Sequence, residues 1–149
     1  MGGVELKKRA IEIRKELGFK THDGELASFL NFSQAFPNNF TALIDSYSTL
    51  ESGILNVVVV GKALIEAGIM NIGIRLDSGD LCELSKKCRE IWNKHVPEVR
   101  LTISASDDLF EERLIQIEKE KSEIDIYAIG TNIATCKKQP ALGLVCKLV

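Results

Sequence analysis

Short polar segments that could hold a phosphate or a carboxylate occur at four places, each directly after an apolar run. They are DSYS at 45–48, RLDSGD at 75–80, SASDD at 104–108 and GTN at 130–132. Backbone amides beside such small residues can bind an anion, and carboxylates can hold a hydrated cation. The same residue types are ordinary helix N-caps, so capping is the simpler interpretation for any single serine or aspartate.

Arg75 is the residue in these segments for which capping offers no explanation. Its guanidinium lies at the end of an apolar run, and the carboxylate of Asp77 follows two residues later. In an extended backbone both side chains point to the same face. Arginine suits two-point binding of a carboxylate or phosphate, which makes Arg75 the main ligand-binding candidate. The alternative is an Arg75–Asp77 ion pair with a purely structural role.

Four apolar, β-branched segments predict the strands that position these residues. They begin about 25–31 residues apart, at 40–44, 71–76, 100–104 and 125–129. The segments between them have the periodicity of amphipathic helices. Strands that alternate with helices at this spacing are typical of parallel βαβ units. The predicted fold class is therefore α/β.

The expected helices begin at residue pairs with capping-box spacing. These pairs are Ser48 with Glu51, Asp80 with Glu83, and Asp108 with Glu111. The run ILNVVVV at 54–60 favours a strand by propensity. However, a capping pair precedes this run, Gly68 follows it as a C-cap, and a parallel strand pair needs a long crossover. We therefore expect a buried helix there.

The chain is predicted to form one domain. Residues 1–37 are a helical lead-in, with helices that stop at Gly18 and before Pro37, and residues 38–149 are successive βα units. A last apolar run at 141–148 is a candidate fifth strand. Five strands fit either a complete open sheet or part of a closed eight-stranded barrel, which usually takes about 250 residues. Periodicity alone does not choose between the two.

Composition and charge exclude several classes of protein. The chain is 45% apolar and 27% charged, as is usual for globular proteins. A net charge of −2 argues against a nucleic-acid partner, and no run is apolar enough to span a membrane. The four cysteines form no CxxC pair and the two histidines lie far apart, which argues against a metal site. We expect free thiols and a cytoplasmic protein.

Three longer blocks of sequence resemble nicotinate phosphoribosyltransferases. They are ALIDSYSTLESGILN at 42–56, RLDSGDL at 75–81 and IDIYAIGTNIATCKKQPALGLVCKLV at 124–149. The segment 26–40 also looks like the helix that precedes a barrel strand in this family. The resemblance covers roughly residues 35–149 and implies part of an irregular, TIM-like α/β barrel. It also implies the activity of NAD salvage, in which nicotinate and phosphoribosyl pyrophosphate give nicotinate mononucleotide and pyrophosphate with ATP hydrolysis and Mg²⁺.

The resemblance carries over particular residues. Arg75 matches the nicotinate-binding arginine, and Thr131 matches the threonine that binds phosphoribosyl pyrophosphate. Four further residues are expected to face the same site, namely Asp77, Ser106, Asp107 and Gly130. Sites of this family are commonly built across a dimer, so we expect a homodimer.

The chain departs from the family in its length and its histidines. Family members run to several hundred residues and carry a phosphorylated histidine early in the barrel, but neither His22 nor His95 lies in such a motif. We therefore expect a fragment that contains no catalytic residue and is inactive alone. Two alternatives stay open. One is a non-catalytic ligand-binding or interaction domain, and the other is a quinolinate-type transferase, which would lack the block at 130–143.

Overall fold

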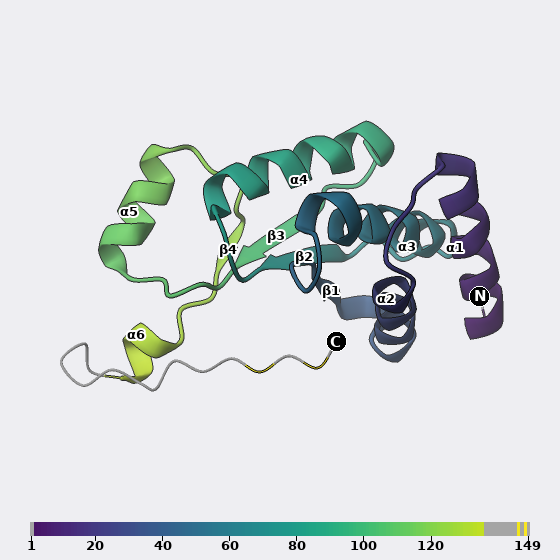
Figure 1. Cartoon of the computed structure of the whole chain (residues 1–149), viewed down its shortest axis with the longest axis horizontal. Coiled ribbons are helices and arrows are strands. Elements are labelled where there is room, and N and C mark those ends of the chain that lie inside the picture. Colours follow the sequence, from purple (N-terminus) through teal and green to yellow (C-terminus); the bar gives the residue numbers. More distant parts are fainter. Residues whose placement is uncertain (1, 136–145, 147, 149) are drawn as a thin grey trace.

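The computed structural model describes residues 2–135, 146 and 148. Two helices lead into an alternation of strands and helices (Figure 1). The elements are α1 (Gly3–Leu17), α2 (Asp23–Ala35), β1 (Phe40–Leu43), α3 (Ile54–Glu66), β2 (Ile72–Leu76), α4 (Leu81–His95), β3 (Thr102–Ala105), α5 (Glu111–Lys119), β4 (Ile126–Tyr127) and α6 (Thr131–Ala134). A short 3-10 turn (Pro37–Asn39) precedes β1 and a π-helical turn (Thr49–Gly53) precedes α3.

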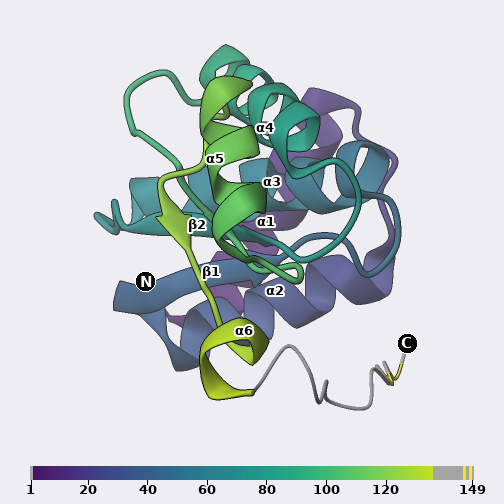
Figure 2. The ribbon, with the colours of Figure 1, turned by 90° about the vertical axis from the view of Figure 1, so that its left-hand side faces the viewer.

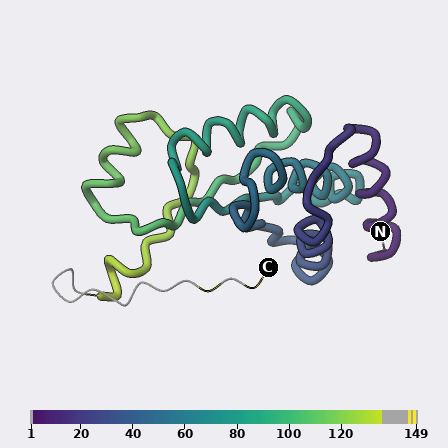
Figure 3. Tube along the Cα trace, in the orientation of Figure 1, coloured from purple at the N-terminus to yellow at the C-terminus, as the bar shows by residue number. Residues whose placement is uncertain are grey.

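The four strands form one parallel sheet in the order β1-β2-β3-β4, which confirms the predicted α/β class. Helices α3 and α4 pack against β2, and α2 packs against β1. In Figure 2, α4 and α5 are seen above the strands and α2 and α6 below them. The trace in Figure 3 places α1 and α2 at one end of the molecule and α5 and α6 at the opposite end.

Successive side chains of a strand point to opposite faces of the sheet, and here one face is buried and the other is more open. In β2, Ile72, Ile74 and Leu76 are almost fully buried, whereas Arg75 between them is exposed. The same alternation leaves Thr41 of β1 exposed. The apolar face packs on the helices, so the polar side chains of β2 are left on the open face.

The run of valines at 57–60 is helical, as predicted, and belongs to α3. Ser48 Oγ accepts a hydrogen bond from the Glu51 N–H at 3.3 Å before this helix. Gly68, with φ +84°, follows its end, and its N–H donates to Ile65 O at 2.9 Å. All four valines are completely buried, since α3 packs against α1, α4 and β2. Burial on every side of the helix outweighs the β propensity of valine.

Helix α5 starts later than its capping signal predicts. The spacing predicts Asp108 as its cap, but the helix begins at Glu111 after Phe110, without a side-chain cap. Asp108 has φ +42°, in the left-handed region. An N-cap needs an extended backbone, so the turn that Asp108 occupies prevents it from capping the helix.

The last strand is shorter than its apolar run suggests. The prediction covered 125–129, but β4 contains only Ile126 and Tyr127, which pair with Ser104 and Ala105 of β3. Only one neighbouring strand in the described part of the chain is available to extend it. The predicted fifth strand at 141–148 lies outside the described residues except for positions 146 and 148.

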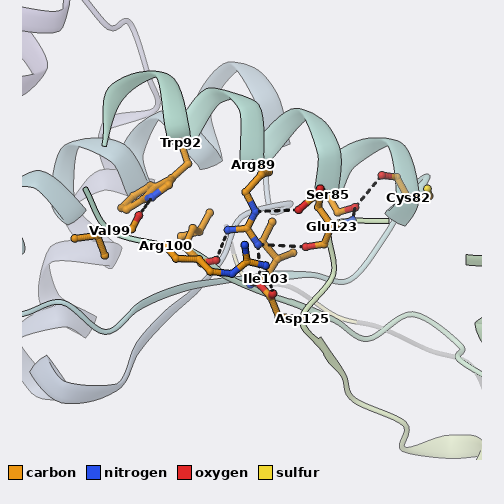
Figure 4. A network of polar contacts seen from close by, with 10 residues as sticks. Cys82, Ser85, Arg89, Trp92, Val99, Arg100, Ile103, Glu123 and Asp125 are labelled. Carbon is orange, nitrogen blue, oxygen red and sulfur yellow. Dashed lines mark hydrogen bonds and ion pairs between the residues drawn. The ribbon is translucent and has the colours of Figure 1, made fainter. Parts of the chain in front are cut away.

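A buried arginine of α4 fixes the segment that leads into β4 (Figure 4). The side chain of Arg89 is 8% exposed. Its guanidinium donates to the backbone carbonyls of Leu101 and Glu123 and to Asp125 Oδ2, the last at 2.8 Å. These contacts join α4 to the residues that lead into β3 and into β4, so they help to place β4 beside β3.

Asp125 completes this network from the opposite side. Its carboxylate also accepts from Arg100 Nη2 at 2.6 Å and from the Ile103 N–H at 2.8 Å. Partial burial alone would raise the pKa of Asp125, but the hydrogen bonds from Ile103, Arg100 and Arg89 outweigh it and hold this pKa below its ordinary value. The carboxylate is therefore stabilised in its charged form.

Candidate functional site

The segments after β2, β3 and β4 enclose a surface cavity of about 590 Å³ at the carboxyl ends of the strands. All six site residues predicted from the sequence line it, namely Arg75, Asp77, Ser106, Asp107, Gly130 and Thr131. Asp108 and Asn132 line it as well. Carboxyl ends of parallel strands are where α/β proteins bind ligands. The expected juxtaposition of these residues is therefore present, while their roles stay predictions.

Three of these residues form a closed ring of polar contacts. Arg75 Nε donates to Ser106 Oγ at 2.7 Å, and Ser106 Oγ donates to Asp77 Oδ1 at 2.6 Å. Arg75 Nη2 lies 3.2 Å from the same Asp77 oxygen. The ion pair considered as a structural alternative for Arg75 is thus formed. It still leaves 48% of the arginine side chain exposed at the cavity.

Strand register brings the ring together across 29 to 31 residues of sequence. Leu76 pairs with Ala105, so the next residues of the two strands, Asp77 and Ser106, are neighbours. The Ser106 N–H donates to Leu76 O at 2.9 Å, which extends this pairing beyond the last paired residues. Ser106 is therefore held by its backbone as well as by the two hydrogen bonds of its hydroxyl.

Asp45, directly after Ile44 at the end of β1, is a residue that the sequence reasoning did not select. Its Oδ2 atom accepts from the Asp77 N–H at 3.2 Å and from the Ser78 hydroxyl. It therefore ties the loop after β1 to the loop after β2. Segment 45–48 is one of the four candidate segments, but choosing Asp45 within it requires knowing that the two loops are adjacent.

Carboxylates give part of the cavity a negative character. Partial burial raises the pKa of Asp107, and the negative charges of Asp77, Asp108 and Asp45 raise it further. A second anion close to Asp107 would be repelled, whereas hydroxyl groups could donate to it. The arrangement suits a ligand that presents an anionic group to Arg75 and hydroxyls to the carboxylates.

The third segment contributes Gly130 and Thr131 at the start of the four-residue helix α6. Gly130 O accepts from the Ile133 and Ala134 N–H groups, both at 3.0 Å. A Cβ atom on Gly130 would meet no atom within 4 Å, so packing among the described residues does not require glycine there. Its backbone is exposed at the cavity and accessible to a ligand.

Both histidines contribute to helix ends outside this cavity. His22 Nδ1 accepts from the Glu25 N–H at 3.2 Å and so caps α2, and the ring stacks on Tyr47 at 3.8 Å. His95 ends α4 and meets Phe19 edge-on. Burial, together with the charges of Lys94 and Lys62, lowers the pKa of His95.

Three further features of the described residues concern metal ligands, membrane spans and thiols. No three His, Cys, Asp or Glu side chains in this part of the chain are placed to hold a metal ion. None of its helices has the length and apolar character needed to cross a membrane. The described cysteines, Cys82, Cys88 and Cys146, are free, and burial raises the pKa of the Cys88 thiol to about 12.

The known proteins that resemble this chain share one name. No protein-family model matches the chain. Curated relatives named nicotinate phosphoribosyltransferase are 44% identical over 143 residues in Dictyostelium discoideum and 38% identical over 134 residues in Homo sapiens. These alignments cover 91% and 86% of this chain and 24% and 25% of the relatives. A protein named nicotinate phosphoribosyltransferase 1 from Arabidopsis thaliana is 44% identical over 136 residues.

A solved structure agrees with the sequence comparison. The crystal structure of human nicotinic acid phosphoribosyltransferase matches with a TM-score of 0.72 and 30% identity over 85% of this chain and 27% of that one. The resemblance stated from the sequence is therefore confirmed. The chain spans about a quarter of the length of the curated relatives it matches.

Proposed function

We propose that the chain is a segment of a nicotinate phosphoribosyltransferase and forms one wall of its substrate site. In the full-length protein, nicotinate and phosphoribosyl pyrophosphate would give nicotinate mononucleotide and pyrophosphate, a step of NAD salvage. The observation that carries the proposal is the single cavity that gathers Arg75, Thr131 and the aspartates. It occurs in a chain that is 38–44% identical to enzymes of that name.

Each side of the cavity suits one part of the substrates. The exposed guanidinium of Arg75 can hold the carboxylate of nicotinate through paired N–H donors. The backbone and hydroxyl of the Gly130–Thr131 segment can bind the phosphoribosyl group. Asp77 and Asp107 can accept hydrogen bonds from ribose hydroxyls. Together these contacts would hold the pyridine ring and the ribose close enough to react.

The proposal extends to the cofactors, the location and the assembly of the full-length protein. The resemblance implies ATP and Mg²⁺, but the described residues contain no cluster that fits a metal ion, and we assign no step of this chain to either. The resemblance also implies a ligase-type coupling to ATP hydrolysis in the full-length protein. Free described cysteines support a cytoplasmic location. Sites of this family are commonly built from residues of two subunits, which supports a homodimer.

The two alternative functions are not favoured by the relatives. A quinolinate-type transferase or a non-catalytic binding domain would share the sheet and its polar rim, but the curated relatives reported above are named for nicotinate. The proposed function and the two alternatives differ in the product that would be formed. A quinolinate-type enzyme would consume quinolinate and release carbon dioxide, and a binding domain would form no product.

The deciding experiment is a product assay on the purified full-length protein that contains this chain. Nicotinate or quinolinate is supplied with phosphoribosyl pyrophosphate, ATP and Mg²⁺, and the nucleotide formed is quantified by chromatography. We expect nicotinate mononucleotide from nicotinate and no product from quinolinate. Product from quinolinate alone, or no product from either acid, would contradict the proposal.

A further inference from the structure

The ring formed by Arg75, Asp77 and Ser106 restricts which part of the guanidinium can meet a ligand. A guanidinium offers two pairs of parallel N–H groups, one at the Nε–Nη2 edge and one at the Nη1–Nη2 edge. Ser106 Oγ occupies Nε at 2.7 Å, and Asp77 Oδ1 lies 3.2 Å from Nη2. The Nε–Nη2 edge is therefore used within the protein.

Ser106 is the member that closes the ring. Its hydroxyl accepts from Arg75 and donates to Asp77 at 2.6 Å, so both of its hydrogen-bonding roles are fixed. Without this hydroxyl, the Nε–H would lose its acceptor and the exposed arginine could turn about its side-chain torsions. The Nε–H would then be free to bind other acceptors, including a ligand.

We propose that Ser106 is a positioning residue that presents the Nη1–Nη2 edge of Arg75 to the carboxylate of the substrate. This inference rests on the proposed function and adds to it the orientation in which the acid is bound. Two parallel N–H donors at a fixed edge match the two oxygens of a carboxylate. A carboxamide offers one oxygen and one NH₂ group. The NH₂ group is a donor and would lie against an N–H donor of Arg75. Holding the edge in place therefore favours the acid over the amide.

The test is steady-state kinetics of the full-length enzyme with nicotinate and with nicotinamide. Ser106→Ala should raise the KM for nicotinate roughly three- to tenfold, the range expected for one lost hydrogen bond. It should leave the KM for phosphoribosyl pyrophosphate within about twofold of the wild-type value. It should also lower the ratio of kcat/KM for nicotinate to kcat/KM for nicotinamide. Ser106→Thr keeps a hydroxyl at the same position and should restore the nicotinate KM.

Ser104→Ala is the matched control. Ser104 lies on the same strand and its hydroxyl donates to Ile74 O at 2.8 Å, so the variant also removes a hydroxyl that bridges β3 and β2. Ser104 pairs with Arg75 across β2 and β3, but among the described residues its hydroxyl makes no hydrogen bond to the guanidinium, so we expect wild-type KM values. A similar rise in Ser104→Ala and Ser106→Ala would show a general effect on the sheet and would overturn the inference.

The ring can also be measured without activity. In the 149-residue chain, ¹⁵N-edited NMR of arginine side chains should show a Nε–H of Arg75 protected from exchange in the wild type and in Ser106→Thr. The protection should be lost in Ser106→Ala. An unprotected Nε–H in the wild type would overturn the inference.

The outcomes separate this inference from the proposed function. If Arg75→Ala weakens nicotinate use but Ser106→Ala leaves the nicotinate KM unchanged, the inference fails and the proposed function stands. If Arg75→Ala leaves nicotinate use unchanged, the assignment of Arg75 fails and the inference fails with it.

Discussion

At the scale of single residues, the structure joins two interpretations of Arg75 that the sequence offered as alternatives. The arginine forms the ion pair with Asp77 and also faces the cavity. An exposed ion pair of this kind contributes little stability. Its more important effect is geometric, because Asp77 and Ser106 together fix the plane in which the guanidinium meets a ligand.

Arg75→Lys keeps the positive charge but loses the planar pair of donors, so nicotinate should bind more weakly to the full-length enzyme. Charge-assisted hydrogen bonds contribute roughly 1.5–3 kcal/mol, which corresponds to a loss of about tenfold to a hundredfold. Arg75→Ala should narrow the preference for nicotinate over nicotinamide, mainly by reducing kcat/KM for the acid. Steady-state kinetics with both pyridines measures this. A kcat/KM for nicotinate within about twofold of wild type in Arg75→Ala would contradict the assignment.

Asp107 gives a prediction about pH and stability. Because its pKa is raised in the folded chain, folding is favoured when the group is protonated, and this contribution is lost as the pH rises through the folded-state pKa. Asp107→Asn should therefore raise the melting temperature at pH 7. The gain should shrink as the pH falls toward the ordinary aspartate value of 3.8, where the native carboxyl becomes protonated. Thermal unfolding between pH 3.5 and 7 measures both effects.

A control for this experiment is available on α5. Glu118→Gln removes a carboxylate from an exposed position of that helix. Glu118 is not among the charges that raise the pKa of Asp107, which are Asp77, Asp108 and Asp45. We expect it to change the melting temperature less than Asp107→Asn at pH 7. Equal gains for the two variants would mean that net charge, rather than the local cluster, controls stability.

At the scale of elements, capping signals succeed where the preceding backbone is extended and fail where it turns. Asp80 has φ −79° and ψ 95° and caps α4, whereas Asp108 has φ +42° and does not cap α5. Both aspartates lie three residues before a glutamate in the sequence. The difference lies in how each loop leaves its strand. The spacing between the aspartate and the glutamate carries no information about this.

Asp80→Ala is expected to destabilise the chain by about 1 kcal/mol, the usual effect of losing an N-cap. The Asp80 carboxylate accepts from the Glu83 N–H at 3.0 Å, and alanine cannot replace this acceptor. Asp80→Asn keeps an acceptor and should retain most of the stability. Urea unfolding followed by circular dichroism measures both variants. If asparagine were as destabilising as alanine, the effect would come from the lost charge and not from the cap.

At the scale of the whole molecule, the described sheet ends at β1 on one side and at β4 on the other. One face packs against helices, while Thr41 and Arg75 are exposed on the other face. A four-stranded parallel sheet of this form matches part of a phosphoribosyltransferase. Under the proposed function, the cavity is one wall of a site that the full-length protein completes.

The 149-residue chain alone is expected to form no nicotinate mononucleotide. The chain corresponds to about a quarter of its curated relatives, and neither of its histidines faces the cavity that gathers the candidate substrate-binding residues. The assay supplies nicotinate, phosphoribosyl pyrophosphate, ATP and Mg²⁺, with a full-length enzyme as the positive control. Product above the no-protein background would contradict this prediction.

The sequence by itself determined the class of fold, the order of the elements and the residues that could bind an anion. These properties are local, because periodicity and capping spacing are set within one or two helical turns. The tertiary structure alone decided that Asp45 ties two loops, that Asp108 does not cap α5, and that Ser106 uses one edge of Arg75. The contacts of Asp45 and Ser106 depend on the parallel pairing of strands about 30 residues apart. The left-handed turn at Asp108 depends on how its loop leaves β3, and neither feature is contained in a pattern of one or two helical turns.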